Sequence, residues 1–230
     1  MNHKVSVVVP ASGAGIRLGG DVPKQFLPLD GKPILKRTLD VFDTLDFVED
    51  IAVAIPTGYE SEVRAYGIKK LRYIVSGAAT RAHSVYAALH CLKNHENIVI
   101  IHDGVRPFVT PEIIKSVVEA TIKHGAAIVC VPMTDTVKIA NENNQVQSTP
   151  NRENLWRAQT PQGFTYPIIT RAYAQAQTDD ILSKVTDDSA LVERIGISVQ
   201  VVEGSNLNIK ITTPIDLILA NALLHQSKLQ

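Results

Sequence analysis

The amino-acid sequence predicts a three-layer α/β fold in which helices cover both faces of a mainly parallel β-sheet. Short runs rich in valine and isoleucine alternate with longer amphipathic segments, which is the pattern of βαβ units. The runs are apolar along their whole length, so both faces of each strand are expected to be covered. Loops at the carboxyl ends of such strands gather at one edge, where open α/β sheets bind ligands.

The expected elements begin near the amino terminus. Strands are expected at KVSVVV, EDIAVAIP, RYIVS, ENIVIIHD and AAIVCVP, and helices near 33–44, 59–69, 80–93 and 111–123. From about residue 134, TDTVKIANENNQVQSTPNRENLWRAQTPQGF shows extended character, a polar turn at ANENNQ and no helical periodicity. We therefore expect a protruding β-hairpin arm at about 134–160. Because an isolated two-stranded ribbon is marginal in water, the arm is expected to pack against a second subunit.

The last part of the chain returns to alternation. A helix is expected near 187–195, then the strand SVQVVE, then a final helix from Thr213 to about Gln226 that a Thr-Pro pair opens. No internal repeat or linker is evident in the 230 residues. A chain of this length with this pattern is expected to form one domain.

Composition argues against several kinds of partner. The 23 basic and 23 acidic residues give a formal net charge of +0, so no global field attracts nucleic acid or an anionic membrane. Any anion must be met by a local site. Cys91 and Cys130 stand in apolar segments, which favours reduced, buried thiols and a cytoplasmic location. No apolar run approaches the roughly 18 residues of a membrane helix.

A glycine-rich stretch, PASGAGIRLGGDVPKQF, follows the first strand. It lacks the third glycine of a dinucleotide fingerprint, because Leu18 stands there, and it lacks the lysine of a P-loop, because Asp21 stands there. Arg17 and Lys24 add positive charge, so we expect a triphosphate cradle; the alternative is a tight turn with solvated cations. Small residues let backbone N–H groups approach an anion. They are Ala11, Ser12, Gly13, Ala14 and Gly15.

Six motifs carry a family resemblance. PASGAGIRLGGDVPKQFLPLDGKPIL resembles the signature of nucleotidyltransferases that activate sugar and polyol phosphates. HDGVRPFVT, DTVK, NRENLWRAQTPQGF, VTDDSALVE and EGSNLNIKITTPIDL resemble, in order and spacing, motifs of the 2-C-methyl-D-erythritol 4-phosphate cytidylyltransferase family of the non-mevalonate isoprenoid pathway. The resemblance implies a single nucleotidyltransferase domain over 1–230 with a Rossmann-like sheet, a homodimer formed through the β-arm, and transfer of CMP from CTP to a polyol phosphate with Mg2+.

The implied reaction needs fixed cations. A phosphate oxygen that is already ionised attacks the α-phosphorus of CTP, so the barrier lies in bringing two polyanions together. Lys210 is expected on a strand between Ile209 and Ile211, where an unpaired lysine facing the core is costly, so it either faces the ligand or points into solvent. By the resemblance, the residues that contact the triphosphate and stabilise its charge are Arg17, Lys24 and Lys210.

Asp103 and Arg106 follow the expected strand IVIIHD, at the edge where substrates dock. The resemblance places them around the ribose, the metal and the polyol, with the metal held mostly through the CTP phosphates. The alternative is a structural aspartate that caps the RPF turn, with Arg106 as its partner. His102 is expected to be packed and hydrogen-bonded rather than a base.

The resemblance assigns the second substrate to the arm and to two later motifs. Arg152 suits a phosphate because its planar guanidinium can bind two oxygens. For Thr160 and Thr186 the alternative is simple β-propensity or helix capping. Some of these residues are expected to come from the partner subunit. The expected contacts to the polyol phosphate, besides Arg106 and Lys210, are Thr136, Arg152, Thr160 and Thr186.

Cytosine recognition is expected in the loop SGAATR, where family members commonly show a G-G-D-E-R type run. Ala78 and Ala79 replace glycine and aspartate, so backbone groups are left to read the N4 amino group of the base. Ser84 is expected to be a hydroxyl partner, and Arg81 to anchor the loop. The ribitol 5-phosphate cytidylyltransferase family shares several of the motifs and remains an alternative, as do a non-catalytic nucleotide-binding module and, more remotely, a dehydrogenase.

Overall fold

The computed structural model describes residues 3–13 and 22–227. Within them the main sheet has the strand order β11-β7-β10-β6-β1-β4-β5. Every neighbouring pair is parallel except the two pairs made by β10, which runs antiparallel to β6 and to β7. This confirms the predicted α/β class with its mainly parallel sheet. The strands are β1 (Val5–Pro10), β4 (Val48–Ile55), β5 (Leu71–Ser76), β6 (Ile98–Ile101), β7 (Ala126–Pro132), β10 (Trp156–Thr165) and β11 (Gln200–Glu203).

Helices cover both faces of the main sheet and form two separate layers. Alternate residues of β1 face opposite sides: Val7 belongs to the cluster that α1 and α4 cover, and Val8 to the cluster that α3, α5 and α6 cover. Both valines are fully buried, and each such burial contributes about 1.5–3 kcal/mol relative to exposure. The α-helices are α1 (Ile34–Asp43), α2 (Glu60–Ala65), α3 (Arg81–Leu89), α4 (Pro111–His124), α5 (Tyr166–Thr178), α6 (Asp188–Arg194) and α7 (Pro214–Ser227).

Local signals set several helix ends. Thr110 caps α4, accepting the N–H of Ile113, Pro111 opens its first turn, and Gly125 ends it at a φ of 83°. Thr80 caps α3 in the same way, accepting the N–H of His83. Three short 3-10 helices, η2 (Lys24–Phe26), η3 (Arg152–Asn154) and η4 (Leu182–Lys184), complete the helical segments that concern the site.

The secondary structure at α5 and at Lys210 differs from the sequence-based expectations. Helix α5 is absent from the expected elements, although Ile169, Ala172, Tyr173 and Ala176 recur at helical spacing and are buried on one face. Lys210 lies in a loop before α7 rather than on a strand. The apolar residues around Lys210 resemble a strand because Ile211 is buried against α7 and the β2 (Pro28–Leu29) to β3 (Lys32–Pro33) hairpin.

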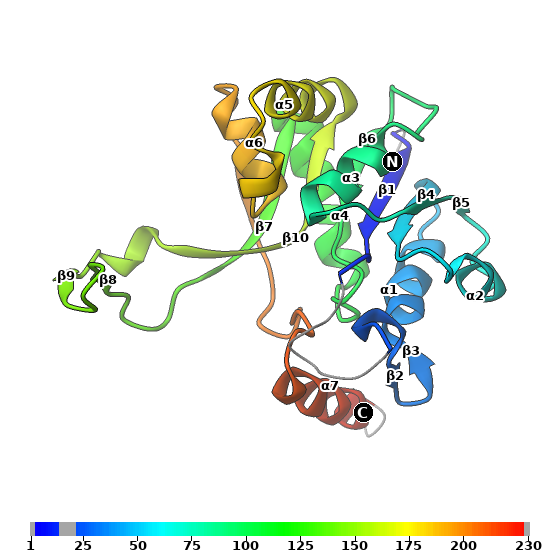
Figure 1. The fold of residues 1–230 in the computed structure, drawn as a ribbon, viewed down its shortest axis with the longest axis horizontal. Helices are drawn as coiled ribbons and strands as arrows, with labels where there is room; N and C mark the ends of the chain where they lie inside the picture. Colours follow the sequence, from blue (N-terminus) through cyan, green and yellow to red (C-terminus); the bar gives the residue numbers. More distant parts are fainter. Residues whose placement is uncertain (1–2, 14–21, 228–230) are drawn as a thin grey trace.

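Residues 133–155 leave the sheet between β7 and β10, and Figure 1 shows them reaching away from the body. Their antiparallel strands β8 (Ile139–Ala140) and β9 (Val146–Ser148) pair around a turn. The expected limit of 160 is too late, since β10 pairs with β7 from Trp156 onward. Figure 1 also shows α7 at the opposite end of the molecule from α5 and α6.

The two thiols differ in burial. Cys130 is buried as expected, whereas Cys91 is only half-buried, and both are free. In the described ranges, none of the helices has the length and apolar character needed to cross a membrane.

Candidate active site

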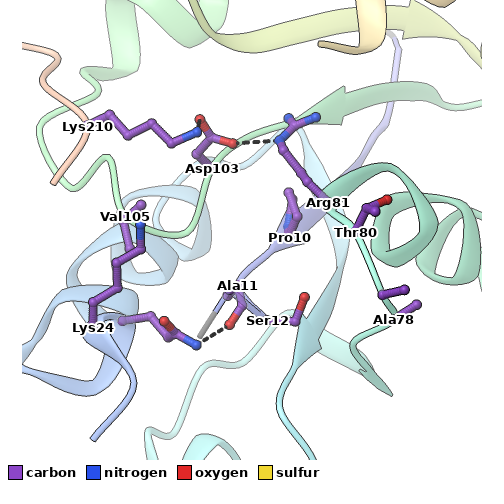
Figure 2. Close-up of a pocket in the computed structure, with 13 residues that line it drawn as sticks. Pro10, Ala11, Ser12, Lys24, Ala78, Thr80, Arg81, Asp103, Val105 and Lys210 are labelled. Atoms are coloured by element: carbon purple, nitrogen blue, oxygen red, sulfur yellow. Dashed lines mark hydrogen bonds and ion pairs between the residues drawn. The ribbon is translucent and has the colours of Figure 1, made fainter. Parts of the chain in front are cut away.

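The loops that follow β1, β5 and β6 meet at one edge of the sheet, around a cavity of about 380 Å3. Figure 2 shows Lys24 and Lys210 on one side of this cavity and Arg81 on the other, with Asp103 between Lys210 and Arg81. The arrangement follows from topology, because the carboxyl ends of neighbouring parallel strands lie side by side. The sequence-predicted residues that line it are Ala11, Ser12, Gly13, Lys24, Ala78, Asp103 and Lys210.

Asp103 is the centre of the charged groups. Its Oδ1 accepts from Nε of Arg81 at 2.9 Å, while its Oδ2 lies 2.9 Å from Nζ of Lys210 and 3.3 Å from Nε of Arg106. Burial by itself would raise the pKa of Asp103, but the three cations together hold that pKa well below its ordinary value. The carboxylate is therefore ionised at neutral pH, and both of its oxygens face cations.

Arg81 bridges two carboxylates. Besides Asp103, its Nη2 lies 2.8 Å from Oδ2 of the fully buried Asp188, at the start of α6. Burial disfavours the charged form of Arg81, yet the two carboxylates raise its pKa well above the ordinary value. Tyr173 of α5 donates its hydroxyl to the other oxygen of Asp188. Asp188 and Tyr173 were not among the expected site residues, although VTDDSALVE places an aspartate at a buried helix start.

A buried chain of hydrogen bonds supports Asp103 from behind. The backbone N–H of Asp103 donates to Oγ1 of Thr160 at 3.0 Å, and that hydroxyl lies 3.1 Å from Nδ1 of His102. Nε2 of His102 donates to the carbonyl of Arg106 at 3.0 Å. Burial lowers the pKa of His102 to about 4, so the ring is neutral at physiological pH. His102 is thus packed and hydrogen-bonded, as expected.

A second cavity of about 280 Å3 adjoins the first. The two share Arg81, Asp103 and Lys210, so these side chains form the boundary between them. The second cavity is also lined by Arg106, Thr160 and Thr186. Two of the nitrogens of Arg106 already have partners within the protein. Its Nη1 donates to the carbonyl of Asn208 at 2.8 Å, and its Nε donates to Oδ2 of Asp103. Two ligands could therefore approach the same three charged groups from opposite sides.

Ser84 fixes the loop that follows β5. Its buried Oγ accepts from the N–H of Ala78 at 3.0 Å, donates to the carbonyl of Thr80 at 3.0 Å, and lies 2.8 Å from Oγ of Ser12. The hydroxyl therefore ties α3, this loop and the end of β1 together within the protein. Gly77 is required beside it, since a Cβ there would lie 1.9 Å from the Cβ of Ser12.

The arm residues do not join this cluster within one chain. Thr136 and Arg152 are exposed on the segment 133–155, and Nη1 of Arg152 donates to the carbonyl of Thr134 at 2.7 Å. Thr160, expected near the arm, instead lies buried in β10. Ala14, Gly15 and Arg17 lie outside the described residues.

The side chains that the structure describes do not form a resident Mg2+ site. In the described part of the chain, no group of three or more His, Cys, Asp or Glu residues is arranged to hold a metal ion. Asp103, the carboxylate expected near the metal, already has cations on both oxygens. Mg2+ prefers oxygen ligands, and in proteins it is commonly held by one or two carboxylates together with the phosphates of the substrate. Residues 3–13 and 22–227 therefore offer a poor Mg2+ site of their own.

A mainly parallel sheet that gathers cations at the boundary of two adjoining cavities is typical of an α/β protein that binds phosphorylated ligands. Comparison with known proteins narrows this class. The family model for 2-C-methyl-D-erythritol 4-phosphate cytidylyltransferase matches residues 5–226. The chain therefore belongs to the 2-C-methyl-D-erythritol 4-phosphate cytidylyltransferase family and is a nucleotidyltransferase, as its motifs predict.

Relatives and solved structures agree with this assignment. The family member of Geotalea uraniireducens is 45% identical over 228 residues, covering 96% of this chain and 97% of its own. The family member of Alkaliphilus oremlandii is 41% identical over 226 residues, which cover 96% of this chain and 95% of the relative. The crystal structure of 4-diphosphocytidyl-2C-methyl-D-erythritol synthase from Anaerococcus prevotii superposes with a TM-score of 0.86 at 33% identity, covering 97% and 96%. The crystal structure of the cytidylyltransferase from Francisella tularensis superposes with a TM-score of 0.83 at 35% identity, covering 95% of this chain and 99% of the other.

Proposed function

We propose that this enzyme transfers CMP from CTP to 2-C-methyl-D-erythritol 4-phosphate, giving 4-diphosphocytidyl-2-C-methyl-D-erythritol and pyrophosphate. The observation that carries the proposal is the position of Lys210. Its Nζ forms an ion pair with Asp103 at the boundary between two cavities. Family membership supplies the two substrates. The product would enter the non-mevalonate isoprenoid pathway.

CTP is assigned to the first cavity and the polyol phosphate to the second. An ionised oxygen of the polyol phosphate attacks the α-phosphorus of CTP, the bond from that phosphorus to the bridging oxygen of the β-phosphate breaks, and pyrophosphate leaves with the electron pair. No proton has to be moved. Lys210 is proposed to contact the equatorial oxygens of the α-phosphate, on which charge builds up in the transition state.

The other cations have positioning roles in this proposal. Lys24 lines the first cavity and would contact the triphosphate together with the backbone around Gly13. Arg17, from the same loop, is proposed to join them. Asp103 holds Lys210 in place before the substrates arrive, and the phosphate oxygens then compete with Asp103 for the ammonium hydrogens. The backbone at Ala78 is proposed to read the cytosine.

The arm is proposed to complete the site of a second subunit. Its residues 133–155 are mostly exposed, and Figure 1 shows that they extend away from the body of the subunit. Arg152 and Thr136 are then free to reach the polyol phosphate bound to the partner in a two-fold homodimer. We further propose that residues 1–230 act as one nucleotidyltransferase domain in the cytoplasm.

Family membership also implies a divalent cation, for which Mg2+ is proposed. Since the described side chains make a poor metal site, the ion would be held mainly by the phosphate oxygens of CTP. Its chemistry when bound would be neutralisation of phosphate charge. Titration with EDTA, followed by addition of Mg2+, would test the requirement through pyrophosphate release.

The decisive test supplies CTP, Mg2+ and 2-C-methyl-D-erythritol 4-phosphate to the purified protein and follows pyrophosphate. Rapid release with this phosphate, and much slower release with ribitol 5-phosphate, is expected. The reverse preference would support the ribitol enzyme instead. CTP binding without pyrophosphate from either phosphate would favour a non-catalytic module, and a fluorescence titration with NAD would test the dehydrogenase alternative.

A further inference from the structure

Residues 204–210, hereafter the lysine loop, form the first part of the connection from β11 to α7 and carry Lys210 at their end. The loop has no regular secondary structure, so its position depends on specific contacts. A lysine side chain is long and flexible, and holding it at a reacting centre requires a fixed backbone beneath it. The contacts of this loop therefore decide where the ammonium group can act.

Asn208 supplies the buried contacts of the lysine loop. Its side chain is fully buried, and its Nδ2 donates to the carbonyl of Thr160 at 2.8 Å and to Oε1 of Gln159 at 3.2 Å. Gln159 returns a hydrogen bond, because its Nε2 donates to the carbonyl of Ser205 at 2.9 Å. These amide groups join the lysine loop to β10, the strand that leads out to the arm.

The start of the loop is pressed against β7 and against Gln159 of β10. The N–H of Gly204 donates to the carbonyl of Cys130 at 2.8 Å. A Cβ at this position would lie 2.4 Å from Cγ1 of Val129 and 2.7 Å from Oε1 of Gln159. Only a glycine leaves room for Gln159 to reach the lysine loop.

The backbone of the loop is held from the opposite side. Nη1 of Arg106 donates to the carbonyl of Asn208 at 2.8 Å, and the N–H of Ile211 donates to the carbonyl of Val105 at 2.9 Å. Asn208 is thus gripped by its side chain from β10 and by its carbonyl from the segment after β6. Lys210, two residues later, then reaches Asp103.

We propose that Asn208 is a positioning residue, whose amide locks the lysine loop onto β10 and thereby holds Lys210 at the boundary of the two cavities. The proposal rests on the function proposed above for Lys210. A purely structural asparagine would affect folding and every step alike. A positioning residue acts only through the lysine that it places.

A double-mutant cycle separates these roles. With Lys210 present, Asn208→Ala is expected to lower kcat by about 10- to 100-fold, with a much smaller change in the KM for CTP. In the Lys210→Ala background, the same substitution is expected to change the residual turnover by less than about threefold. An equal loss in both backgrounds would overturn the proposal. The matched control is Asn206→Ala: Asn206 lies in the same loop, is exposed, and accepts from Arg157 at its surface.

Hydrogen exchange tests the lock without reference to activity. In Asn208→Ala, amides of 204–211 are expected to exchange faster while the core of β10 stays protected; unchanged loop protection would count against the lock. If Asn208→Ala does not fold, Gln159→Met removes the hydrogen bonds of Gln159 with Asn208 and Ser205 but keeps the one from Asn208 to the carbonyl of Thr160. It is expected to show a smaller non-additivity with Lys210→Ala, of the same sign. Absence of pyrophosphate from the wild-type enzyme would refute the proposed function and the kinetic role of Asn208, whereas loss of loop protection would still establish the anchor.

Discussion

Lys210 and Asp103 meet with 2.9 Å between Nζ and Oδ2, although one precedes α7 and the other follows β6. Among the described residues, the two cavities are lined by four cations, Lys24, Arg81, Arg106 and Lys210, and by two carboxylates, Asp103 and Asp187, while the buried Asp188 pairs with Arg81. The cleft therefore carries more positive than negative charge at this point. A phosphate oxygen arriving here finds a lysine that is already oriented and a local excess of cations.

Replacing Lys210 by alanine is expected to lower turnover by about 10²- to 10⁴-fold, because the transition-state charge on the α-phosphate loses its nearest proposed cation. Stability should change by less than about 1 kcal/mol, since the side chain is partly exposed and two arginines still accompany Asp103. Pyrophosphate release and thermal unfolding measure the two effects. Lys115→Ala, on the exposed face of α4, is the matched control. Unchanged turnover in Lys210→Ala would remove the lysine from the mechanism.

Replacing Ser84 by alanine is expected to raise the KM for CTP about tenfold with a smaller effect on kcat, because the loop at Ala78 and the hydroxyl of Ser12 lose their common partner. The loss of buried hydrogen bonds should also cost about 1–3 kcal/mol of stability. Steady-state kinetics with varied CTP checks the first effect. Ser183→Ala, at an exposed serine, provides the comparison. A KM equal to that of the wild type would show that this loop does not meet CTP.

The fold could be predicted from the sequence because its signals are local. Apolar runs gave the parallel strands, and cap residues such as Thr110 and Gly125 set helix ends. Helix α5 was missed where a strand leads directly into a helix, since β10 ends at Thr165 and α5 begins at Tyr166 with no polar loop between them. The strand assigned around Lys210 failed because burial against α7 produces the same apolar pattern as a sheet.

The site was only partly accessible to sequence reasoning. Lys24, Asp103 and Lys210 could be named from motifs, and the structure brings them to one cleft. The roles of Asp188 and Asn208 depend on contacts between distant segments, which no local pattern encodes. Ser84 looked like a group facing the base, but its hydrogen bonds are made within the protein.

His102 is expected to make the protein less stable in mild acid. The unfolded chain takes up a proton on this residue below about pH 6.5, whereas the folded protein does so only near its lowered pKa of about 4. The unfolded state therefore binds more protons between these values, and the free energy of unfolding falls by up to about 3 kcal/mol as the pH drops through them. Denaturant unfolding from pH 7.5 to 4.5 measures this slope.

His102→Gln should reduce the slope of the free energy of unfolding against pH by the equivalent of about one bound proton, because the glutamine side chain does not titrate. His3→Gln, at an exposed residue near the amino terminus, should leave the slope as in the wild type. Identical slopes for the wild type and His102→Gln would show that the buried ring does not govern acid stability.

The proposed sharing of the active site between two subunits predicts that two inactive variants restore each other's activity. Arg152→Ala damages the arm, whereas Lys210→Ala damages the cleft, and each alone is expected to be nearly inactive. In a mixed dimer, the intact lysine of one subunit meets the intact arm of the other, so one of the two sites is complete. Random mixing should then recover about a quarter of wild-type turnover, since half of the dimers are mixed and each has one working site.

The recovery is measured by pyrophosphate release after the two variants are unfolded and refolded together, with each variant refolded alone as the control. Arg157→Ala, at an exposed arginine in β10 that bonds Asn206, replaces Arg152→Ala in a comparison mixture. Arg157 contacts the lysine loop of its own chain and lines neither of the two cavities. The Arg157→Ala variant is therefore expected to be active before mixing. If the Arg152→Ala and Lys210→Ala mixture stays as inactive as its components, both residues serve the same subunit or no exchange of arms occurs. Size-exclusion chromatography of the mixture separates these cases, since a monomer rules out the shared site and a dimer assigns Arg152 to its own cleft.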